Sequence, residues 1–234
     1  KMNLLHFLIV FTLIPNLLFS YANNPPNGRT GAPGEGTCGD CHSSYTLNSG
    51  SGSVYLTGVP NEYNPGETYA ITVHVTHPSM TRWGFELAAK NDDGVQGGEI
   101  LVTQSGLTTS SNWNDITYIK QRNQGTFAGQ NNGAEWTFDW QAPQQDDGVI
   151  SFYVAGNAAN YNNNTAGDYI YTNSFQSEPA LICTPSGDAT QDGLVNIVDV
   201  ITVVQHVLGN NDLSGYEFCI VDLNQDGIID VGDI

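Results

Sequence analysis

Two cysteines and a histidine near the N-terminus are spaced for chemistry on a porphyrin. Cys38 and Cys41 lie three positions apart, and His42 follows directly. Two thiols at this spacing can add to the two vinyl groups of haem, while the adjacent imidazole reaches the iron from one side. The motif therefore predicts covalently bound haem c, with Cys38 and Cys41 as thioether attachments and His42 as the proximal iron ligand.

The same motif allows other chemistry. Cys38 and Cys41 could instead form a small disulfide, or half of a zinc site that needs two further ligands. If haem is bound, Met80 is the preferred sixth ligand because its thioether can raise the reduction potential. The other side chains that could reach the far side of the iron are His77 and His74. An iron without a sixth protein ligand is a further alternative.

Two segments near the C-terminus repeat the oxygen pattern of a calcium-binding loop. Residues 188–199 and 222–233 place oxygen side chains at positions 1, 3, 5, 9 and 12, glycine at 6 and a main-chain carbonyl at 7. Hard oxygen ligands in a tight turn select calcium over softer metals. The predicted ligands of two calcium ions are Asp188, Thr190, Asp192, Leu194, Asn196 and Asp199, then Asp222, Asn224, Asp226, Ile228, Asp230 and Asp233.

The residues around these loops predict the elements that position them. Apolar side chains recur every three or four positions between residues 197 and 208, which predicts an amphipathic helix that ends at Gly209. Cys183 and Cys219 each precede one loop closely. A disulfide between them would join the two loops.

The middle of the chain has the pattern of an antiparallel β-sandwich. Apolar and polar residues alternate in 69–76, 83–87 and 135–140, while 149–154 is a continuous apolar run typical of a central strand. Turn residues separate these stretches. Residues 104–114 and 121–133 are predicted to be long polar loops. The fold class is therefore mainly β, followed by a small α-helical module with paired calcium loops.

The net charge and the two ends of the sequence indicate where the protein is located and which partners it can have. Six basic against 24 acidic side chains give a net charge of −18, and no Lys or Arg follows Arg122, which excludes a nucleic-acid partner. Residues 1–22 resemble a bacterial signal peptide, so we expect a secreted or cell-surface protein without a membrane span after cleavage. The sequence stops close to the second calcium loop, as a fragment of a longer reading frame would.

The expected organisation has five parts. They are a signal peptide (1–22), a Gly/Pro-rich segment with the Cys-x-x-Cys-His motif (23–52), a β-sandwich (53–176), a linker (177–186) and a calcium module (187–234).

The C-terminal segments 187–200 and 221–234 resemble a truncated type I dockerin. Dockerins bind cohesin modules and attach extracellular enzymes or adhesins to scaffolds, often for polysaccharide breakdown. The resemblance therefore implies a cohesin-like module or another surface scaffold protein as partner. At loop positions 10 and 11, where family members often carry partner-reading polar residues, this chain has Ile197, Val198, Val231 and Gly232.

Residues 29–175 resemble the Reeler-like domain of exported bacterial proteins called choice-of-anchor V. The segments that carry the resemblance are 30–35, 38–43, 63–69, 83–87, 138–143, 152–160 and 167–172. The resemblance implies an immunoglobulin-like β-sandwich, a secreted or surface location, a variable C-terminal anchoring device and no established enzyme activity.

Together these features favour a non-catalytic protein. The sequence has no nucleophile elbow, His-Glu-x-x-His motif or phosphate loop, and Glu86, Glu99 and Asp168 would form a glycosidase pair only if the fold brought two together. The preferred function is electron transfer or redox sensing by a haem module that meets an electron-transfer partner. The alternative is a carbohydrate-binding or adhesion module of a polysaccharide-degrading assembly, with a Cys38–Cys41 disulfide. Its candidate sugar-stacking residues are Tyr55, Trp113, Tyr161 and Tyr169.

Overall fold

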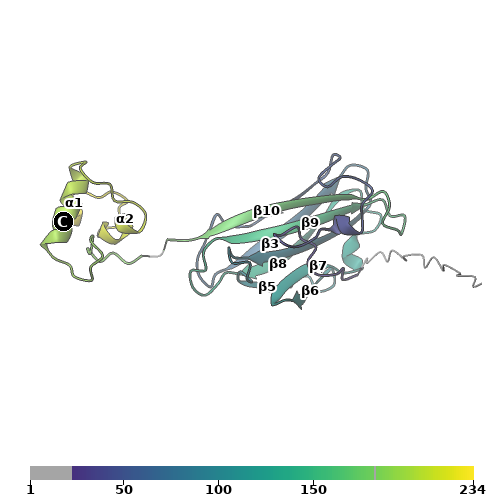
Figure 1. Cartoon of the computed structure of the whole chain (residues 1–234), viewed down its shortest axis with the longest axis horizontal. Helices are drawn as coiled ribbons and strands as arrows, with labels where there is room; N and C mark the ends of the chain where they lie inside the picture. The colour runs from purple at the N-terminus through teal and green to yellow at the C-terminus, as the bar shows by residue number, and fades with distance from the viewer. Residues whose placement is uncertain (1–22, 182) are drawn as a thin grey trace, which may run out of the picture. The chain divides into compact units, whose positions relative to one another are not determined.

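The computed structural model describes residues 23–181 and 183–234, so the signal peptide predicted at residues 1–22 lies outside the described part. The chain divides into two compact units between Pro179 and Ala180. In the described part, no helix is long and apolar enough to cross a bilayer. Figure 1 labels the main strands and helices of both units.

The N-terminal unit consists of two β-sheets (Figure 1). The smaller sheet has the order β1-β3-β8-β5, with bounds Ser53–Thr57, Thr68–His77, Asn132–Gln141 and Glu99–Leu101. The larger sheet has the order β2-β10-β9-β4-β7-β6, with bounds Glu62–Tyr63, Tyr169–Pro179, Ile150–Ala159, Arg82–Lys90, Ile116–Gln121 and Thr108–Trp113. The short β2 pairs parallel with β10, and the other strand pairs are antiparallel. The predicted β-sandwich is confirmed.

Alternation along the strands builds the core between the sheets. In β3, Ile71, Val73 and Val75 have no exposed surface, while the residues between them are partly exposed. They belong to one cluster with Trp136 of β8 and Phe85 of β4. Apolar side chains at every second position thus fix which face of each strand is turned inward.

β9 lies in the interior of the larger sheet, hydrogen-bonded to β10 on one side and β4 on the other. Most of its residues are buried, which agrees with the continuous apolar run predicted for residues 149–154. A strand buried on both faces needs cover on the outer side as well as the core side.

The prediction of two long polar loops was partly wrong. Residues 104–114 contain strand β6, which pairs with β7 in a regular antiparallel register. Residues 121–133 contain only the short turn η2 (Gln124–Thr126) and the beginnings and ends of strands. β6 is an edge strand whose polar side chains mostly face solvent, so it lacks the apolar alternation that reveals a half-buried strand.

A strap, defined here as residues 24–37, covers part of the outer face of the larger sheet. The main-chain N–H of Arg29 donates to Glu86 on β4 (2.8 Å). Lys120 on β7 donates from Nζ to the main-chain oxygen of Pro25 (2.7 Å) and lies 3.5 Å from Glu86. These polar side chains are almost completely buried, and the strap supplies a partner to Lys120 Nζ and to Glu86 Oε2, while Glu86 Oε1 accepts no hydrogen bond from the described residues.

The far part of the strap is held by Glu35. Its carboxylate accepts hydrogen bonds from Thr30 (2.6 Å), Lys90 (2.5 Å) and Tyr118 (2.5 Å). Burial alone would raise the pKa of Glu35, but the hydrogen bonds from Lys90, Thr30 and Tyr118 outweigh it and lower that pKa. Glu35 is therefore a charged anchor between the strap and strands β4 and β7.

The C-terminal unit contains α1 (Ile197–Val207), α2 (Tyr216–Val221) and the turn η3 (Val231–Asp233) (Figure 1). The helix predicted between the loops is α1, and α2 was not predicted. The predicted disulfide between Cys183 and Cys219 is present, with a Cα–Cα distance of 6.2 Å. The buried core of the unit is small and comprises Ala189, Val203, Leu213, Ile220, Val221 and Ile229.

Candidate functional site

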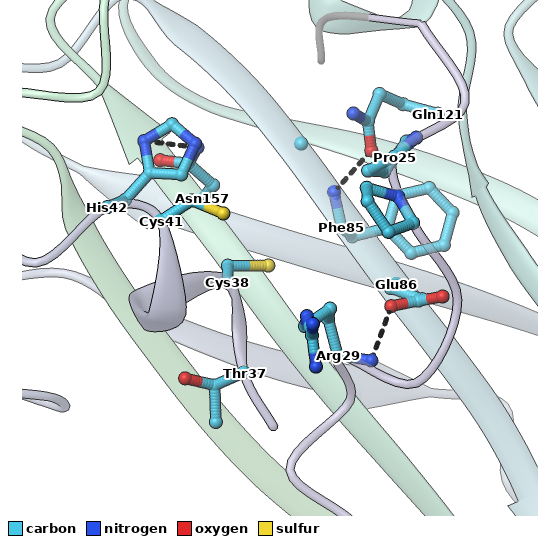
Figure 2. Close-up of a pocket in the computed structure, with 12 residues that line it drawn as sticks. Pro25, Arg29, Thr37, Cys38, Cys41, His42, Phe85, Glu86, Gln121 and Asn157 are labelled. Carbon is cyan, nitrogen blue, oxygen red and sulfur yellow. Dashed lines mark hydrogen bonds between the residues drawn. The ribbon is translucent and has the colours of Figure 1, made fainter. Parts of the chain in front are cut away.

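The Cys-x-x-Cys-His motif follows the strap as a single helical turn, η1 (Cys38–Asp40). Thr37 caps this turn and forms a capping box with Asp40, and the N–H of His42 donates to the main-chain oxygen of Cys38 (3.0 Å). The close folding of this turn places both sulfur atoms on one side, facing Phe85 and the strap (Figure 2). Both thiols are free.

His42 is oriented by the carboxylate of Asp168, which directly precedes β10 and is 126 positions away in the sequence. Its Nδ1 lies 2.7 Å from Asp168, whose side chain is 1% exposed and also accepts the N–H of Asn160 (3.0 Å). This contact assigns the Nδ1 proton to the bond with Asp168 and leaves Nε2 as the free lone pair. A carboxylate on the distal nitrogen is the usual support of a metal-binding histidine.

The nearest polar neighbour of Nε2 is the side-chain amide of Asn157 on β9, at 3.4 Å. The Oδ1 atom of Asn157 is buried and has no hydrogen-bond partner among the described residues. An unpaired buried oxygen costs free energy unless another group meets it. The site therefore combines an imidazole nitrogen, whose contact is a long one from the Asn157 amide, with an amide oxygen that has no partner among the described residues.

These groups line a cavity of about 90 Å³ between the strap, the cysteine turn and the outer face of the larger sheet (Figure 2). Gly84 of β4 lies in register opposite Asn157 and forms part of its floor. A Cβ atom at Gly84 would come within 3.1 Å of the side chain of Gln121, which is itself fixed by a bond from the N–H of Phe85 (2.8 Å). Glycine at this position thus keeps the floor open.

A second cavity of about 40 Å³ adjoins the first, and His42, Gly84, Gln121 and Asn157 line both. The first cavity contains the cysteines, two prolines and Phe85. The second is more polar and is lined by Arg82, Tyr161, residues 162–164 and Asp168. The lining of the two cavities therefore differs in polarity, and the smaller cavity is the more polar one.

Burial shifts the pKa values of Cys38 and of the nearby Glu86. It raises the pKa of the Cys38 thiol to about 12, and the negative charge of Glu86 adds to this effect. Burial also raises the pKa of Glu86 to about 7, although Lys120 and the N–H of Arg29 oppose it. At neutral pH Cys38 is a protonated thiol, which is neither a nucleophilic thiolate nor a thiolate metal ligand.

The candidate sixth ligands do not line either cavity. Met80 packs into the core between the sheets and is 9% exposed. His77 is 4% exposed and stacks on Tyr169 with ring centroids 4.7 Å apart. His74 bonds Thr57 on the smaller sheet (3.0 Å). The structure therefore brings Cys38, Cys41 and His42 together but leaves these three candidates in other packing environments.

The donor set fits a covalently bound haem, because two free thiols and an oriented imidazole face one partly apolar cavity. The cavity volumes are smaller than the roughly 300–1,000 Å³ typical of cofactor pockets. A bound porphyrin therefore requires the strap residues that line the larger cavity, Pro25, Pro26 and Arg29, to move aside, or leaves part of the ring in solvent.

The two predicted calcium loops fold alike. In the first, the Asp188 carboxylate accepts the N–H groups of Asp192 (3.2 Å) and Gly193 (2.9 Å). In the second, Asp222 accepts those of Asp226 (3.2 Å) and Gly227 (3.0 Å). The sixth-position glycines have φ of 85° and 80°, a left-handed conformation that favours glycine.

The last aspartate closes each loop. Asp199 accepts from Thr190 (2.9 Å) and Asn196 (2.7 Å), and Asp233 accepts from Leu223 (2.9 Å) and Asp230 (3.0 Å). Backbone N–H groups, chiefly those of Asn196 and Asp230, lower the pKa values of Asp199 and Asp233 respectively. Such folded loops fit the oxygen chemistry of calcium.

In residues 23–181 and 183–234, no three His, Cys, Asp or Glu side chains gather into a cluster that could hold a metal ion. The predicted calcium ligands also include amide, hydroxyl and main-chain oxygens. These come from Thr190, Asn196 and Asn224 and from the carbonyls of Leu194 and Ile228.

Several residues of the haem site were not identified from the sequence as site residues. Asp168 and Asn157 lie 126 and 115 positions from His42, so no local spacing connects them. Both fall in the segments 152–160 and 167–172 that carry the Reeler-like resemblance. That resemblance was the available signal for them. Arg82 had none.

The residues of the alternative functions are dispersed. Glu86 lines the larger cavity, Asp168 lines the smaller one, and Glu99 is on the other sheet. The four aromatic candidates have separate neighbours: Tyr55 stacks on His74, Trp113 lies near Tyr118, Arg82 lies over Tyr161, and Tyr169 stacks on Tyr45. These contacts unite neither a carboxylate pair nor an aromatic platform.

Comparisons with known proteins give only distant likenesses. No protein-family model and no curated protein matches the chain. The human F-spondin reeler domain is 18% identical over 57% of this chain and 94% of that one (TM-score 0.40). A cohesin module of a family 33 glycoside hydrolase from Clostridium perfringens is 10% identical over 55% and 96% (TM-score 0.40). A type I cohesin–dockerin complex from Clostridium thermocellum is 11% identical over 51% and 97% (TM-score 0.31). At these TM-scores the likenesses decide neither family nor function.

Proposed function

We propose that the N-terminal unit carries covalently bound haem and acts in electron transfer or redox sensing at or outside the cell surface. The observation that carries this proposal is the joint placement of two free thiols and the Asp168-supported imidazole of His42 at one cavity. Cys38 and Cys41 would hold the porphyrin, and His42 would bind its iron through Nε2. Haem supplies one-electron chemistry at the iron.

The residues around the haem would set its environment. Asp168 fixes the tautomer of His42 and makes Nε2 a stronger donor. The strap restricts water on one side, which affects the reduction potential through the local dielectric. The Cys183–Cys219 disulfide is consistent with an oxidising extracellular compartment.

The C-terminal unit is proposed to attach the protein to a surface scaffold in the presence of calcium. The similar folding of its two loops around Asp188 and Asp222 supports this proposal. Ile197, Val198 and Val231 are 67%, 51% and 79% exposed. Exposed apolar side chains on so small a unit favour contact with another protein over a free spacer. Cells that export the protein should retain it in calcium and release it when a chelator is added.

The haem proposal is tested by expression in a host with haem-attachment machinery. The purified protein should be red, and its Soret absorption should survive acid–acetone extraction because thioether bonds are covalent. Cys38→Ser with Cys41→Ser is the matched variant and should lose the colour on extraction. A colourless wild-type product with a Cys38–Cys41 disulfide would contradict the proposal and support the carbohydrate-binding or adhesion alternative, which retention on insoluble polysaccharide would then test.

A further inference from the structure

The two adjoining cavities differ in their charged groups. The cysteines, Pro25 and Phe85 line the larger cavity together with Arg29 and Glu86, and both Arg82 and Asp168 line the smaller one. Asp168 is paired with His42 at 2.7 Å, so Arg82 is the charged side chain of the smaller cavity that has no ionic partner in the part of the chain that the structure describes. A porphyrin that is joined to cysteines through its vinyl edge carries its two propionate carboxylates on another edge, and Arg82 has the charge to meet them.

Arg82 is one of two arginines without an ion-pair partner among the described residues, and the other, Arg122, lines neither cavity. The protein has only six basic against 24 acidic side chains, yet no carboxylate of the described residues lies within ion-pair distance of Arg82. Arg29, Lys90 and Lys120, by contrast, each pair with a carboxylate. Because Arg82 contacts an amide and an aromatic ring and no carboxylate, its positive charge is available to an anionic ligand.

The neighbours of Arg82 fix its position but occupy only part of its N–H donors. Nη1 donates to Oδ1 of Asn163 (3.2 Å), and the guanidinium lies over the ring of Tyr161, 5.1 Å from its centroid. A guanidinium has five N–H donors, and its planar fork suits a carboxylate. Arg82 therefore keeps donors for a carboxylate ligand.

The loop beside Arg82 is rigid and neutral. The N–H groups of Asn162, Asn164 and Ala166 donate in turn to the side-chain oxygens of Asn160, Asn162 and Asn164 (3.0, 3.0 and 2.7 Å). These successive turns fix the loop that lines the smaller cavity. Its uncharged amides add hydrogen-bonding groups without repelling an anion.

From these contacts we infer that Arg82, supported by the loop of residues 160–164, binds the propionate groups of the haem attached at Cys38 and Cys41. The inference rests on the proposed function and deepens it. Arg82 would act as a positioning and charge-compensating residue, because it would orient the carboxylate edge and offset the negative charge of the propionates. A nearby positive charge favours ferrous over ferric haem, and it lowers the pKa of the propionates.

The test compares haem-loaded proteins that differ only at arginines. Arg82→Gln should have a lower midpoint potential than the wild type, and the propionate ionisation seen in the pH dependence of the potential should move to higher pH. Arg82→Lys, which keeps the charge, should retain most of the wild-type potential. Arg122→Gln is the matched control, because Arg122 also lacks an ion-pair partner among the described residues but lines neither cavity.

The outcomes separate the two proposals. A loaded Arg82→Gln protein with the potential and pH profile of Arg122→Gln would overturn the propionate assignment and leave the haem proposal standing. A wild-type protein without covalent haem would overturn both. If Arg82→Gln does not fold, Asn163→Ala is compared with Arg122→Gln instead: loss of the Asn163 contact that holds Arg82 should still move the propionate ionisation, and an unchanged ionisation would overturn the assignment.

Discussion

The bond between His42 and Asp168 is the residue-scale contact on which the proposed chemistry depends most. The carboxylate is 1% exposed and 2.7 Å from Nδ1, so its negative charge acts on the imidazole with little solvent between them. It also accepts the N–H of Asn160, which ties the histidine to the loop after β9. The same carboxylate thus orients the predicted iron ligand and holds the neighbouring loop.

Replacing Asp168 by Asn tests the electronic part of this contact. Asp168→Asn keeps an oxygen acceptor for Asn160 but removes the charge at His42. We expect an affinity loss of about 10- to 100-fold for the His42–iron bond, seen as a matching fall in the imidazole concentration that displaces His42. Asp147→Asn removes an exposed charge elsewhere and should leave this concentration unchanged. Equal values for both variants would show that Asp168 does not support the ligand.

Glu86 predicts a pH effect on stability. Burial raises the pKa of Glu86 from 4.5 to about 7, so the folded protein binds a proton there that the unfolded chain has lost. The contribution of Glu86 is therefore full below pH 4.5 and is lost as pH rises towards 7, by at most about 1.4 kcal/mol per pH unit. Denaturant titrations of wild type and Glu86→Gln between pH 4.5 and 7 should show this slope in their difference.

Glu35→Gln is a second test of that prediction, because the negative charge of Glu35 is one of the causes that raise the pKa of Glu86. Removing that charge should move the Glu86-dependent loss of stability to lower pH. The pKa of Glu35 itself is lowered, so its own contribution is lost only as pH falls below 4.5. A difference between wild type and Glu86→Gln that does not change between pH 4.5 and 7 would contradict the raised pKa of Glu86.

Residue spacing identified only the local half of the candidate site at His42. Cys38, Cys41 and His42 are neighbours in sequence, so the haem hypothesis could be formed from them alone. Asp168 and Asn157 reach the site only because β9 and β10 pair in the sheet that carries the cysteine turn on its outer face. Long-range contacts of this kind have no spacing signal in one sequence.

At the scale of elements, the turns at residues 188–199 and 222–233 follow most directly from the local sequence. The proposed calcium ligands, the glycines and the capping residues of each turn lie within twelve consecutive positions, so local chemistry defines each loop. Asn196 and Asp230 begin α1 and η3 as predicted ligands that also act as helix caps. In contrast, strand β6 is stabilised by pairing with β7. It is an edge strand with polar side chains on both faces, so its sequence lacks the apolar alternation that would predict a strand.

Removal of calcium ligands tests the loops. We expect Asp188→Ala with Asp222→Ala to abolish the calcium-dependent increase in helical circular dichroism, because ligand chemistry and loop folding are coupled. Chelator should have the same effect on the wild type. Asp212→Ala, which removes an exposed carboxylate outside both loops, should retain the full response. If chelator leaves the wild-type signal unchanged, the calcium assignment is wrong.

At the scale of the whole molecule, two compact units have different sources of stability. The N-terminal unit has a large core between its two sheets, whereas six small or aliphatic residues form the buried core of the C-terminal unit. So small a core needs additional restraint, and the disulfide across 36 positions provides it. Calcium would add to that restraint.

Calorimetry of the full chain should therefore resolve two transitions. Cys183→Ser with Cys219→Ser should lower the free energy of unfolding of the C-terminal unit by about 2–4 kcal/mol. The N-terminal transition is the internal control and should not move. A common shift of both transitions would mean that the two units unfold as one.

Intact mass spectrometry of the protein, expressed with haem-attachment machinery, tests the central claim most directly. The account predicts the mass of the polypeptide plus one haem, and the loss of that addition in Cys38→Ser with Cys41→Ser. A mass equal to the polypeptide alone, with Cys38 and Cys41 joined to each other, would contradict it.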